Sequence, residues 1–179
     1  NEGRFFDANF VRFRSGFPEK MGGWVKKYTS SFVGTCRKIK QWVSLTGTKY
    51  IALGTTKKTY IIQGTTFVDV TPIRATTSAG DATFAASDGS STVTVNETGH
   101  NAVEGDFVTF SGAASLGGNV TADVLNQEYE ILAISSANAF TITAKDTSGT
   151  TVTANASDSG NGGSSTVAAF QISIGEDVA

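Results

Sequence analysis

The chain has 179 residues, of which 39% are hydrophobic and 17% are charged, and it contains 20 glycines but only 2 prolines. It has no apolar run long enough for a membrane helix and no apolar signal core near its N-terminus, so we expect neither membrane insertion nor secretion. One cysteine, Cys36, and one histidine, His100, exclude an internal disulfide framework and a structural zinc site. We therefore expect no metal and no cofactor.

The net charge of −2 conceals a division between two parts of the chain. Residues 1–74 carry thirteen basic and four acidic residues, a net charge of +9. Residues 75–179 carry one basic residue, Lys145, and twelve acidic residues, a net charge of −11. Such asymmetry favours two modules or a polarised assembly surface.

The opening stretch FVRFRSGFPEKMGGWVKK, residues 10–27, combines basic and aromatic side chains with glycines and has no helical periodicity. Its β-forming residues predict strands over Asn9–Arg14 and Trp24–Tyr28. Because neighbouring side chains of a strand point to opposite faces, the phenylalanines would face a core and the arginines would point outward. Contact with nucleic acid stays open as an alternative, since basic grooves with aromatic platforms bind single strands.

Basic side chains of this first part form a predicted assembly or docking face. Its members are Arg12, Arg14, Lys20, Lys26, Lys27, Arg37, Lys38 and Lys40. Such a face could meet solvent, an acidic protein neighbour or phosphates. Strand alternation places these basic side chains outward, opposite the aromatic ones, so we expect this face to meet a protein neighbour or solvent.

The next segment has the clearest organisation in the chain. Aromatic and β-branched runs, separated by Gly- and Thr-rich turns, predict an antiparallel meander of four strands. The predicted strands are 39–45, 49–53, 59–63 and 67–70. Four strands in about 40 residues match the size of one β-propeller blade, and an ordinary meander is the alternative. A single blade does not close a propeller, so a propeller would require further chain beyond residue 179.

After Arg74 the composition changes to a low-complexity join, and a second β-rich segment follows. Its predicted strands are 92–96, 106–111, 128–135 and 139–143, with a loop before the third strand. Alternating apolar residues could fill the core of a small barrel or sandwich. They are Val93, Val95, Phe107, Val108, Phe110, Tyr129, Ile131, Phe140 and Ile142. Residues 144–166 are rich in Gly, Ser and Thr and predict a flexible loop.

The chain closes with AAFQISIGEDVA, in which Phe170, Ile172 and Ile174 alternate with other residues as in a half-buried strand. The predicted organisation is therefore all-β and has three parts. Residues 1–75 form N-terminal strands and a propeller-like meander. Residues 76–166 form an inserted small β-module with flexible flanks. Residues 167–179 return to the host domain, and we expect the chain to be truncated there.

A search for catalytic residues finds no convincing constellation. His100 could serve a Ser-His-Asp triad, but no Gly-x-Ser-x-Gly elbow is present. Paired carboxylates are available at Glu104 and Asp106 and at Glu128 and Glu130. Positions i and i+2 share one face of a strand, so Glu128 and Glu130 predict a solvated acidic face. We expect no catalytic residue and no enzyme activity.

The opening resembles the N-terminal part of the tail nozzle family of short-tailed phages, also called tail tubular protein B or packaged-DNA stabilisation protein. The matching residues are Asn9, Gly16, Pro18, Lys20, Gly22, Gly23 and Trp24. The meander KYIALGTTKKTYIIQGTTFVDVTPIR is similar to that family's recurring pattern. The closing AAFQISIGEDVA resembles the strand by which such chains re-enter the host domain after an insertion.

The inserted segment is similar to a small β-module of phage tail and baseplate proteins. The matching residues are Gly99, His100, Gly105, Asp106, Val108, Ser111, Gly112, Tyr129, Ile131, Asn138, Phe140 and Thr141. The chain departs from this pattern in the spacing between His100 and Gly105 and in a long loop at residues 115–124. The register of that loop is therefore not fixed by the resemblance.

The resemblance implies a structural protein of the virion, located in the phage tail. It implies a ring of self-associated copies, six in the family, beside the tail adaptor and tail fibre proteins, with genomic DNA as a partner in passage only. One alternative is a carbohydrate-binding or adhesin module of a tail fibre or cell-surface protein, and another is a fragment of an enzyme. Burial of Trp24, Trp42 and Tyr50 would favour the scaffold, whereas a flat exposed cluster would favour sugar stacking.

Overall fold

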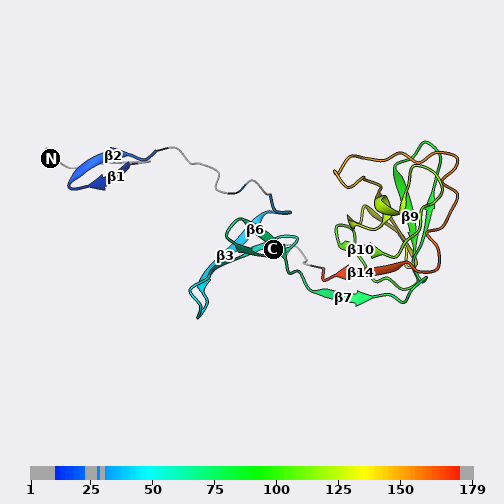
Figure 1. Cartoon of the computed structure of the whole chain (residues 1–179), viewed down its shortest axis with the longest axis horizontal. Coiled ribbons are helices and arrows are strands. Elements are labelled where there is room, and N and C mark those ends of the chain that lie inside the picture. Colours follow the sequence, from blue (N-terminus) through cyan, green and yellow to red (C-terminus); the bar gives the residue numbers. More distant parts are fainter. Residues whose placement is uncertain (1–10, 23–27, 29–30, 174–179) are drawn as a thin grey trace. The chain divides into compact units, whose positions relative to one another are not determined.

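The computed structural model describes residues 11–22, 28 and 31–173. Across these residues it contains fourteen β-strands and one short helix (Figure 1), which confirms the predicted all-β class. The chain divides into two compact units, Asn1–Ser31 and Phe32–Ala179, and each is described by itself. The sequence did not predict a division after Ser31, and the three predicted domain boundaries stay predictions.

The first unit contains an antiparallel hairpin of β1 (Val11–Arg14) and β2 (Phe17–Lys20). The turn residues Ser15 and Gly16 both have positive φ, 50° and 81°, as two-residue hairpin turns of the favoured type require. The strand predicted to end at Arg14 is therefore present from Val11 onward. We did not predict β2, whose proline lacks the N–H that a central strand needs. Trp24–Lys27, most of the second predicted strand, lies outside the described residues.

The second unit begins with the predicted four-stranded meander, in which the order of strands in space equals their order in the chain. The strands are β3 (Cys36–Val43), β4 (Lys49–Thr55), β5 (Thr59–Gln63) and β6 (Thr66–Asp69). Gly47 and Gly64 lie in turns at φ 82° and 61°, a conformation that glycine adopts without steric cost. The outer strands of this sheet are β3 and β6. The comparison with a propeller blade stays a prediction.

Packing within the meander is uneven. Leu53, Tyr60 and Ile62 are buried, and the backbone N–H of Val33 donates a hydrogen bond of 3.1 Å to the Tyr60 hydroxyl. In contrast, seven of the eight residues of β3 are exposed. Stable sheets normally bury at least one face against a second layer. The meander therefore has an incomplete core of its own.

The rest of the second unit is a module of two four-stranded antiparallel sheets. The strands of the first sheet, in spatial order, are β11 (Glu128–Glu130), β10 (Phe107–Ser111), β14 (Val167–Gln171) and β7 (Ile73–Thr76). The strands of the second are β12 (Ala133–Ser136), β13 (Ala139–Thr143), β9 (Thr92–Asn96) and β8 (Thr83–Ala86). Neither sheet closes on itself, so of the two predicted forms the structure has the sandwich.

The two sheets share one hydrophobic core. Eight of the nine residues predicted for it belong to this core and are at most 5% exposed, which confirms the prediction for them. Phe107 is buried outside this core, beside Lys58 of the meander. Two edge-to-face aromatic contacts join the sheets: the ring centroids are 5.0 Å apart for Phe84 and Phe110 and 5.9 Å apart for Phe140 and Phe170. Such aromatic pairs stabilise beyond the area that they bury. The module thus has the closed core that the meander lacks.

Several boundaries of the module differ from the predictions. The predicted strand Glu128–Ser135 is two strands, β11 and β12, which belong to different sheets. Between them, the N–H of Ile131 bonds the carbonyl of Asp106, and the N–H of Leu132 bonds the carbonyl of Thr141, each at 2.8 Å. A segment that changes sheet in this way makes a corner of a sandwich. The period-2 pattern continues across the corner, so sequence alone did not reveal it.

Three elements lie where we predicted a join, a loop or a return to the host sheet. β7 and β8 form within or beside the low-complexity join, because their partners β14 and β9 supply the pairing. The helix α1 (Ala122–Leu125) forms in a predicted loop, where the Thr121 side chain accepts a hydrogen bond from the Val124 N–H. β14 pairs with β10 and β7 of the module, and not with the meander as we expected.

The segment predicted as a flexible loop, residues 144–166, is held in place by one buried carboxylate. Asp158 accepts backbone N–H bonds from Gly118, Asn119, Val120 and Asn155 at 2.8–3.0 Å. Burial alone would raise the pKa of Asp158, but these donors outweigh it and lower the pKa below its ordinary value. The Gly-, Ser- and Thr-rich composition predicted a flexible loop, because composition does not reveal that the backbone N–H groups of residues 118–120 bind Asp158.

Candidate functional site

The residues of the predicted basic face fall in both compact units. Arg12, Arg14 and Lys20 lie on the hairpin of the first unit. The other three described members, Arg37, Lys38 and Lys40, lie on β3 of the second unit, and Lys26 and Lys27 lie outside the described residues. The six described residues therefore belong to two candidate surfaces, one in each unit, and whether either is a docking face stays a prediction.

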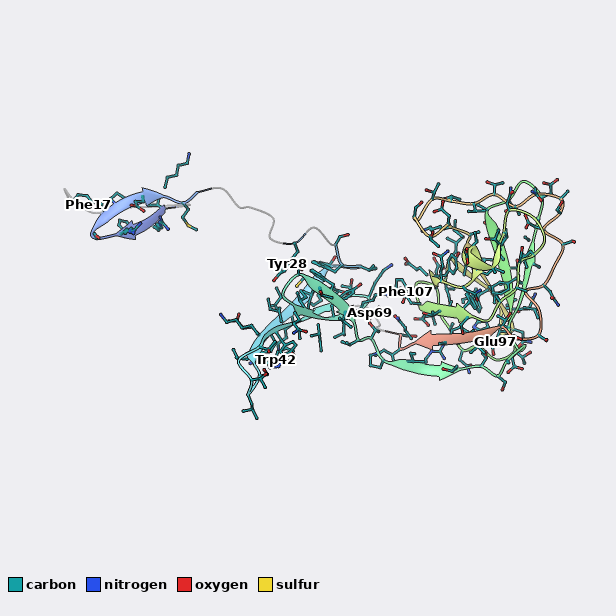
Figure 2. All side chains as sticks on the ribbon, viewed as in Figure 1. Phe17, Tyr28, Trp42, Asp69, Glu97 and Phe107 are labelled. Atoms are coloured by element: carbon teal, nitrogen blue, oxygen red, sulfur yellow. The ribbon has the colours of Figure 1, made fainter. Side chains whose placement is uncertain are left out.

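The hairpin surface differs from the prediction in the exposure of its aromatic residues. Arg12 forms an ion pair of 3.0 Å with Glu19, its cross-strand neighbour. Phe13 is 56% exposed, so it does not fill a core of the described hairpin as we expected. Phe17, labelled in Figure 2, is more exposed still. It is the cross-strand partner of Arg14, so the two side chains lie on the same face of the hairpin. A two-stranded ribbon is too thin to enclose these rings.

The β3 surface consists of three exposed cations on an outer strand of the meander. Within the described residues, Arg37, Lys38 and Lys40 form no ion pair with a carboxylate. Lys38 and Lys40 face the same side of the sheet, because residues two apart in a strand share a face. This surface can attract a negatively charged partner without first breaking a contact of its own.

An aromatic pair lies on the same face of the meander. Trp42 and Tyr50 are cross-strand neighbours, with ring centroids 5.5 Å apart and ring planes within 19° of parallel. Trp42 is 39% exposed, and Tyr50 is half-buried. These two rings are therefore accessible, the arrangement that we associated with sugar stacking, whereas Trp24 lies outside the described residues.

A buried lysine joins the meander to the module. Lys58, next to β5, is only 2% exposed. Its ammonium nitrogen lies 2.7 Å from a carboxylate oxygen of Asp69 and 2.6 Å from one of Glu128, and 4.4 Å from the ring centre of Phe107. Asp69 belongs to the meander, whereas Glu128 and Phe107 belong to the module. We refer to these four residues as the Lys58 cluster.

Electrostatics favour the charged forms of Lys58 and Asp69. Burial alone would lower the pKa of Lys58, but hydrogen bonds and charge attraction from Asp69 and Glu128 outweigh burial and raise it. Burial alone would raise the pKa of Asp69, but hydrogen bonds from Lys58 and Thr71 lower it. The cluster is therefore an ion-paired joint between two sheets.

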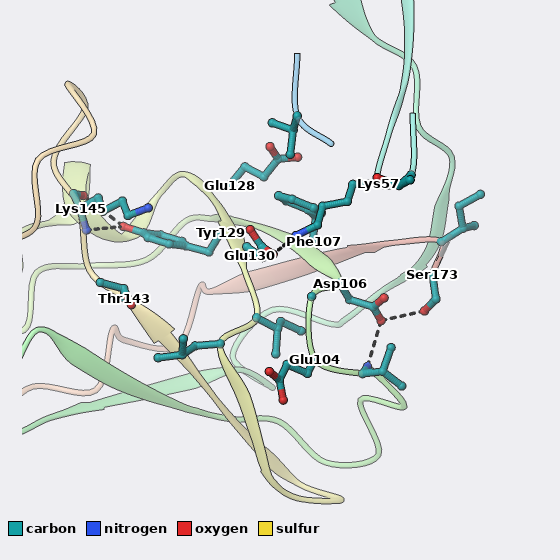
Figure 3. A pocket seen from close by; sticks show the side chains of 17 residues that line it. Lys57, Glu104, Asp106, Phe107, Glu128, Tyr129, Glu130, Thr143, Lys145 and Ser173 are labelled. Carbon is teal, nitrogen blue, oxygen red and sulfur yellow. Dashed lines mark hydrogen bonds and ion pairs between the residues drawn. The ribbon is translucent and has the colours of Figure 1, made fainter. Parts of the chain in front are cut away.

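A groove of about 860 Å³ lies beside this joint (Figure 3). Glu104, Glu128, Glu130, Lys57 and Lys145 are among the charged residues that line it. Most of its charged groups already have partners: Lys57 forms an ion pair with Glu130, and Glu128 pairs with Lys58. The acidic face predicted at Glu128 and Glu130 is thus not simply solvated, because lysines of the meander neutralise it.

The candidates for triad chemistry have structural partners. His100 is 5% exposed, its Nδ1 accepts the Ala102 N–H at 3.0 Å, and its Nε2 lies 3.0 Å from the Ser136 carbonyl. Asp106 accepts the Ser173 hydroxyl at 2.8 Å and the Val103 N–H at 3.0 Å. Both side chains thus fix loops at one end of the module. His100 lies in a loop, and its burial depends on partners that the sequence did not reveal.

In residues 11–22, 28 and 31–173, no group of three or more His, Cys, Asp or Glu side chains could hold a metal ion. No helix within the same ranges has the length and apolar character to cross a membrane.

Sequence reasoning missed the Lys58 cluster. Lys57 and Lys58 stand together in the turn GTTKK, which reads as a solvated turn. Asp69 gave one indication of an ion pair, because it is the one acidic residue between positions 32 and 72. The second carboxylate, that of Glu128, comes from the module, so no local pattern would have predicted that Lys58 is buried.

Comparisons with known proteins give little further information. No family model and no curated protein matches the chain. Among solved structures, a phage phi92 endosialidase is similar over 87% of this chain and 21% of its own, with 18% sequence identity and a TM-score of 0.36. The chain thus spans about a fifth of the length of that protein. A likeness at this level carries no argument about function, which must rest on the chain's own residues.

Proposed function

We propose that this chain is a structural protein in the tail of a short-tailed phage, of the nozzle type. In this proposal it assembles into a ring that retains packaged DNA and forms the conduit for its ejection. Six copies, with the tail adaptor and tail fibre proteins as neighbours, are the expectation from the sequence resemblance. The chain performs no chemistry of its own in this role.

The observation that carries the proposal is the uncovered meander. Ile39 is 63% exposed and Val43 59%, both on one face of β3, which is an outer strand of its sheet. Val68 of β6, the other outer strand, is 48% exposed on the opposite face. Exposed apolar side chains on both faces of an uncovered sheet favour an interaction surface. A subunit of a larger assembly would bury these side chains against its neighbours.

The distribution of charge supports the same reading. The cations of β3 have no carboxylate partner in the described chain, and the segment from residue 75 onward has a net charge of −11. Copies that present both signs can attract one another, which favours correct association. DNA in passage would meet few tight contacts if these cations face protein, since tight lysine–phosphate contacts would slow its movement.

Immunogold labelling of intact virions with an antibody against this chain tests the proposal. We expect gold particles at the distal end of a short tail. Label along fibres would contradict the nozzle assignment and favour the adhesin function. Particles without label, although the antibody recognises the purified chain and the disrupted virions, would contradict both.

A second function is favoured by the stacked pair of Trp42 and Tyr50. Accessible aromatic rings beside exposed polar groups, here Gln63 in the same cross-strand row, are suited to a carbohydrate ligand. A glycan array, followed by titration of any hit with Trp42→Ala, tests this function. Glycan binding that Trp42→Ala abolishes would support it, whereas an array without hits would remove it.

A further inference from the structure

β3 is one of the two outer strands of the meander. It has eight residues and, among the residues that the structure describes, pairs with β4 on one side only. Its backbone therefore presents a row of donors and acceptors on the other side. Natural proteins protect such an edge with a short strand, a proline, a bulge, lysines or a covering loop. β3 is longer than an average strand and contains no proline, and its register shift lies at one end, between Cys36 and Lys38. Its lysines disfavour a second basic strand and favour an acidic one.

The two faces of β3 differ in chemistry. By cross-strand register, Lys38, Lys40 and Trp42 share a face with Gly54, Ala52 and Tyr50 of β4, in that order. Ile39 and Val43 lie on the opposite face, and Ile39 is paired with Leu53. The edge is thus basic on one face and apolar on the other. A partner strand that complements both faces must have acidic and apolar side chains at alternate positions.

Within residues 31–173, the cations of this edge lack the carboxylate partner that three other cations of the unit have. Lys57 and Lys58 each contact a carboxylate, and Arg74 lies 4.0 Å from one. The one acidic residue of the meander, Asp69, is held by Lys58 and Thr71 and is not available to β3. Charge complementarity at Lys38 and Lys40 must therefore come from outside the meander.

We propose that β3 accepts one further strand, an extended segment of a neighbouring protein in which acidic residues alternate with apolar ones. Its acidic residues would lie opposite Lys38 and Lys40, about 6.7 Å apart along the strand. Its apolar residues would cover Ile39 and Val43 on the other face. This mode is β-strand addition, in which backbone hydrogen bonds supply affinity and alternate side chains supply specificity. The inference rests on the proposed function in taking the neighbour to be a protein of the assembly.

A nucleic acid fits this edge less well than a peptide does. Phosphates could bind Lys38 and Lys40, and a base could stack on Trp42. They would leave Ile39 and Val43 on the opposite face exposed, at 63% and 59%. Single-strand binding also relies on a series of stacking platforms along a basic groove, whereas this face of the meander offers a single stacked pair.

Peptide binding to the whole chain tests the proposal. The probe is a capped, fluorescently labelled nine-residue peptide of alternating Glu and Val, and binding is measured by anisotropy at low salt. Two controls have the same length: one has the same residues in separate Glu and Val blocks, and the other has Lys in place of Glu. We expect the alternating acidic peptide to bind at least about tenfold more tightly than either control. Amide hydrogen exchange of β3 should slow in that complex.

Charge reversal at the edge sharpens the test. Lys38→Glu/Lys40→Glu should lower the affinity for the alternating acidic peptide by roughly tenfold and raise the affinity for the Lys–Val peptide, because cross-strand charges attract or repel one another directly. The matched control is Arg14→Glu/Lys20→Glu, which changes the same charge on the separate hairpin unit. That control should leave both affinities within about twofold, because neither residue belongs to the strand with which the peptide would pair. Circular dichroism establishes that each variant is folded.

Three results would overturn the inference. They are equal binding of the block and alternating peptides, unchanged exchange of β3 in the complex, and equal loss of affinity in the two charge-reversal variants. Failure of any peptide to bind the folded chain would also overturn it. The nozzle proposal is judged separately by the labelling of virions, so failures of the two are distinguishable.

Discussion

The meander and the module are both built from antiparallel strands, yet they solve the problem of burial differently. The module encloses Phe84, Phe110, Phe140 and Phe170 between two sheets and is folded around a core of its own. The meander has a single sheet, and β3 leaves most of its side chains exposed. This difference teaches that strand content alone does not define a self-sufficient domain; a second layer does.

Charge follows the same division. The part of the chain that includes the meander is basic, and the part that follows residue 74 is acidic. Ion pairs join the two where Lys57 and Lys58 meet Glu130 and Glu128, whereas the cations of β3 have no such partner. The module's surface charge is thus partly used within the chain, and the edge of the meander is left to attract a neighbour.

The largest expected effect comes from the module core. Phe110→Ala should reduce the free energy of unfolding by about 3–5 kcal/mol, because it removes a buried ring and leaves a cavity. Trp42→Ala in the meander should cost less than about 1 kcal/mol, because part of that ring is already in water. Urea unfolding, followed by circular dichroism, measures both. Equal losses in the free energy of unfolding would contradict the contrast between the closed core of the module and the incomplete core of the meander.

Asp158 should give the next largest effect. Asp158→Asn keeps the size of the side chain but removes the charge that four backbone N–H groups bond, at a cost of about 2–3 kcal/mol. Because the pKa of Asp158 is lowered in the folded state, its stabilisation is present above the ordinary Asp value of about 3.9 and is lost as pH falls through the folded value. Unfolding of both proteins at pH 7 and at low pH checks this. A difference that does not shrink in acid would contradict the assignment.

The Lys58 cluster should contribute less, because its carboxylates are partly exposed. Lys58→Met should lower the free energy of unfolding by about 1–2 kcal/mol, because it leaves Asp69 and Glu128 without their cation but within reach of water. The contribution of Asp69 is lost as pH falls through its lowered pKa, and that of Lys58 is lost as pH rises through its raised pKa. The cost should therefore be largest between about pH 5 and 9.

A double-mutant cycle isolates this joint. Lys58→Met and Glu128→Gln should be non-additive in urea unfolding, because the two side chains contact each other across the two sheets. Lys49→Met, a change at an exposed lysine of β4, is the matched control and should be additive with Glu128→Gln. Additivity of both pairs would show that the ion pair does not join the two sheets energetically.

The smallest expected effect is on the hairpin of the first unit. Arg12 and Glu19 form an exposed ion pair, and Arg12→Ala should change the free energy of unfolding by no more than about 0.5 kcal/mol. Thermal unfolding at low and high salt measures it. A larger loss would indicate that the hairpin packs on other parts of the chain.

Local patterns in the sequence predicted the strands that pair with their neighbours in the chain. Residues 92–96 and 139–143 are strands with the predicted bounds, and Phe140 and Ile142 are buried as alternation requires. Patterns failed where a distant partner decides the structure. β7 forms because β14 pairs with it, and residues 144–166 are fixed because Asp158 finds the amides of residues 118–120.

The candidate site was predictable to a smaller extent. The cations of β3 were identified from charge and composition, and their exposure agrees with the outward face that we expected. The burial of Lys58 was not predictable, since Glu128 reaches it from the module. The exposure of Phe13 and Phe17 was also missed, because alternation predicts which side chains share a face but not whether a second layer covers that face.

Oxidative footprinting of Trp42 tests the central claim most directly, namely that the meander is covered in an assembly. The isolated chain and intact virions are exposed to hydroxyl radicals, and oxidation of the peptide that contains Trp42 is measured by mass spectrometry. The account predicts strong oxidation in the isolated chain and at least about a tenfold slower reaction in virions, since buried rings lose access to solvent. Equal oxidation in both, or virions that contain no peptide of this chain, would contradict it.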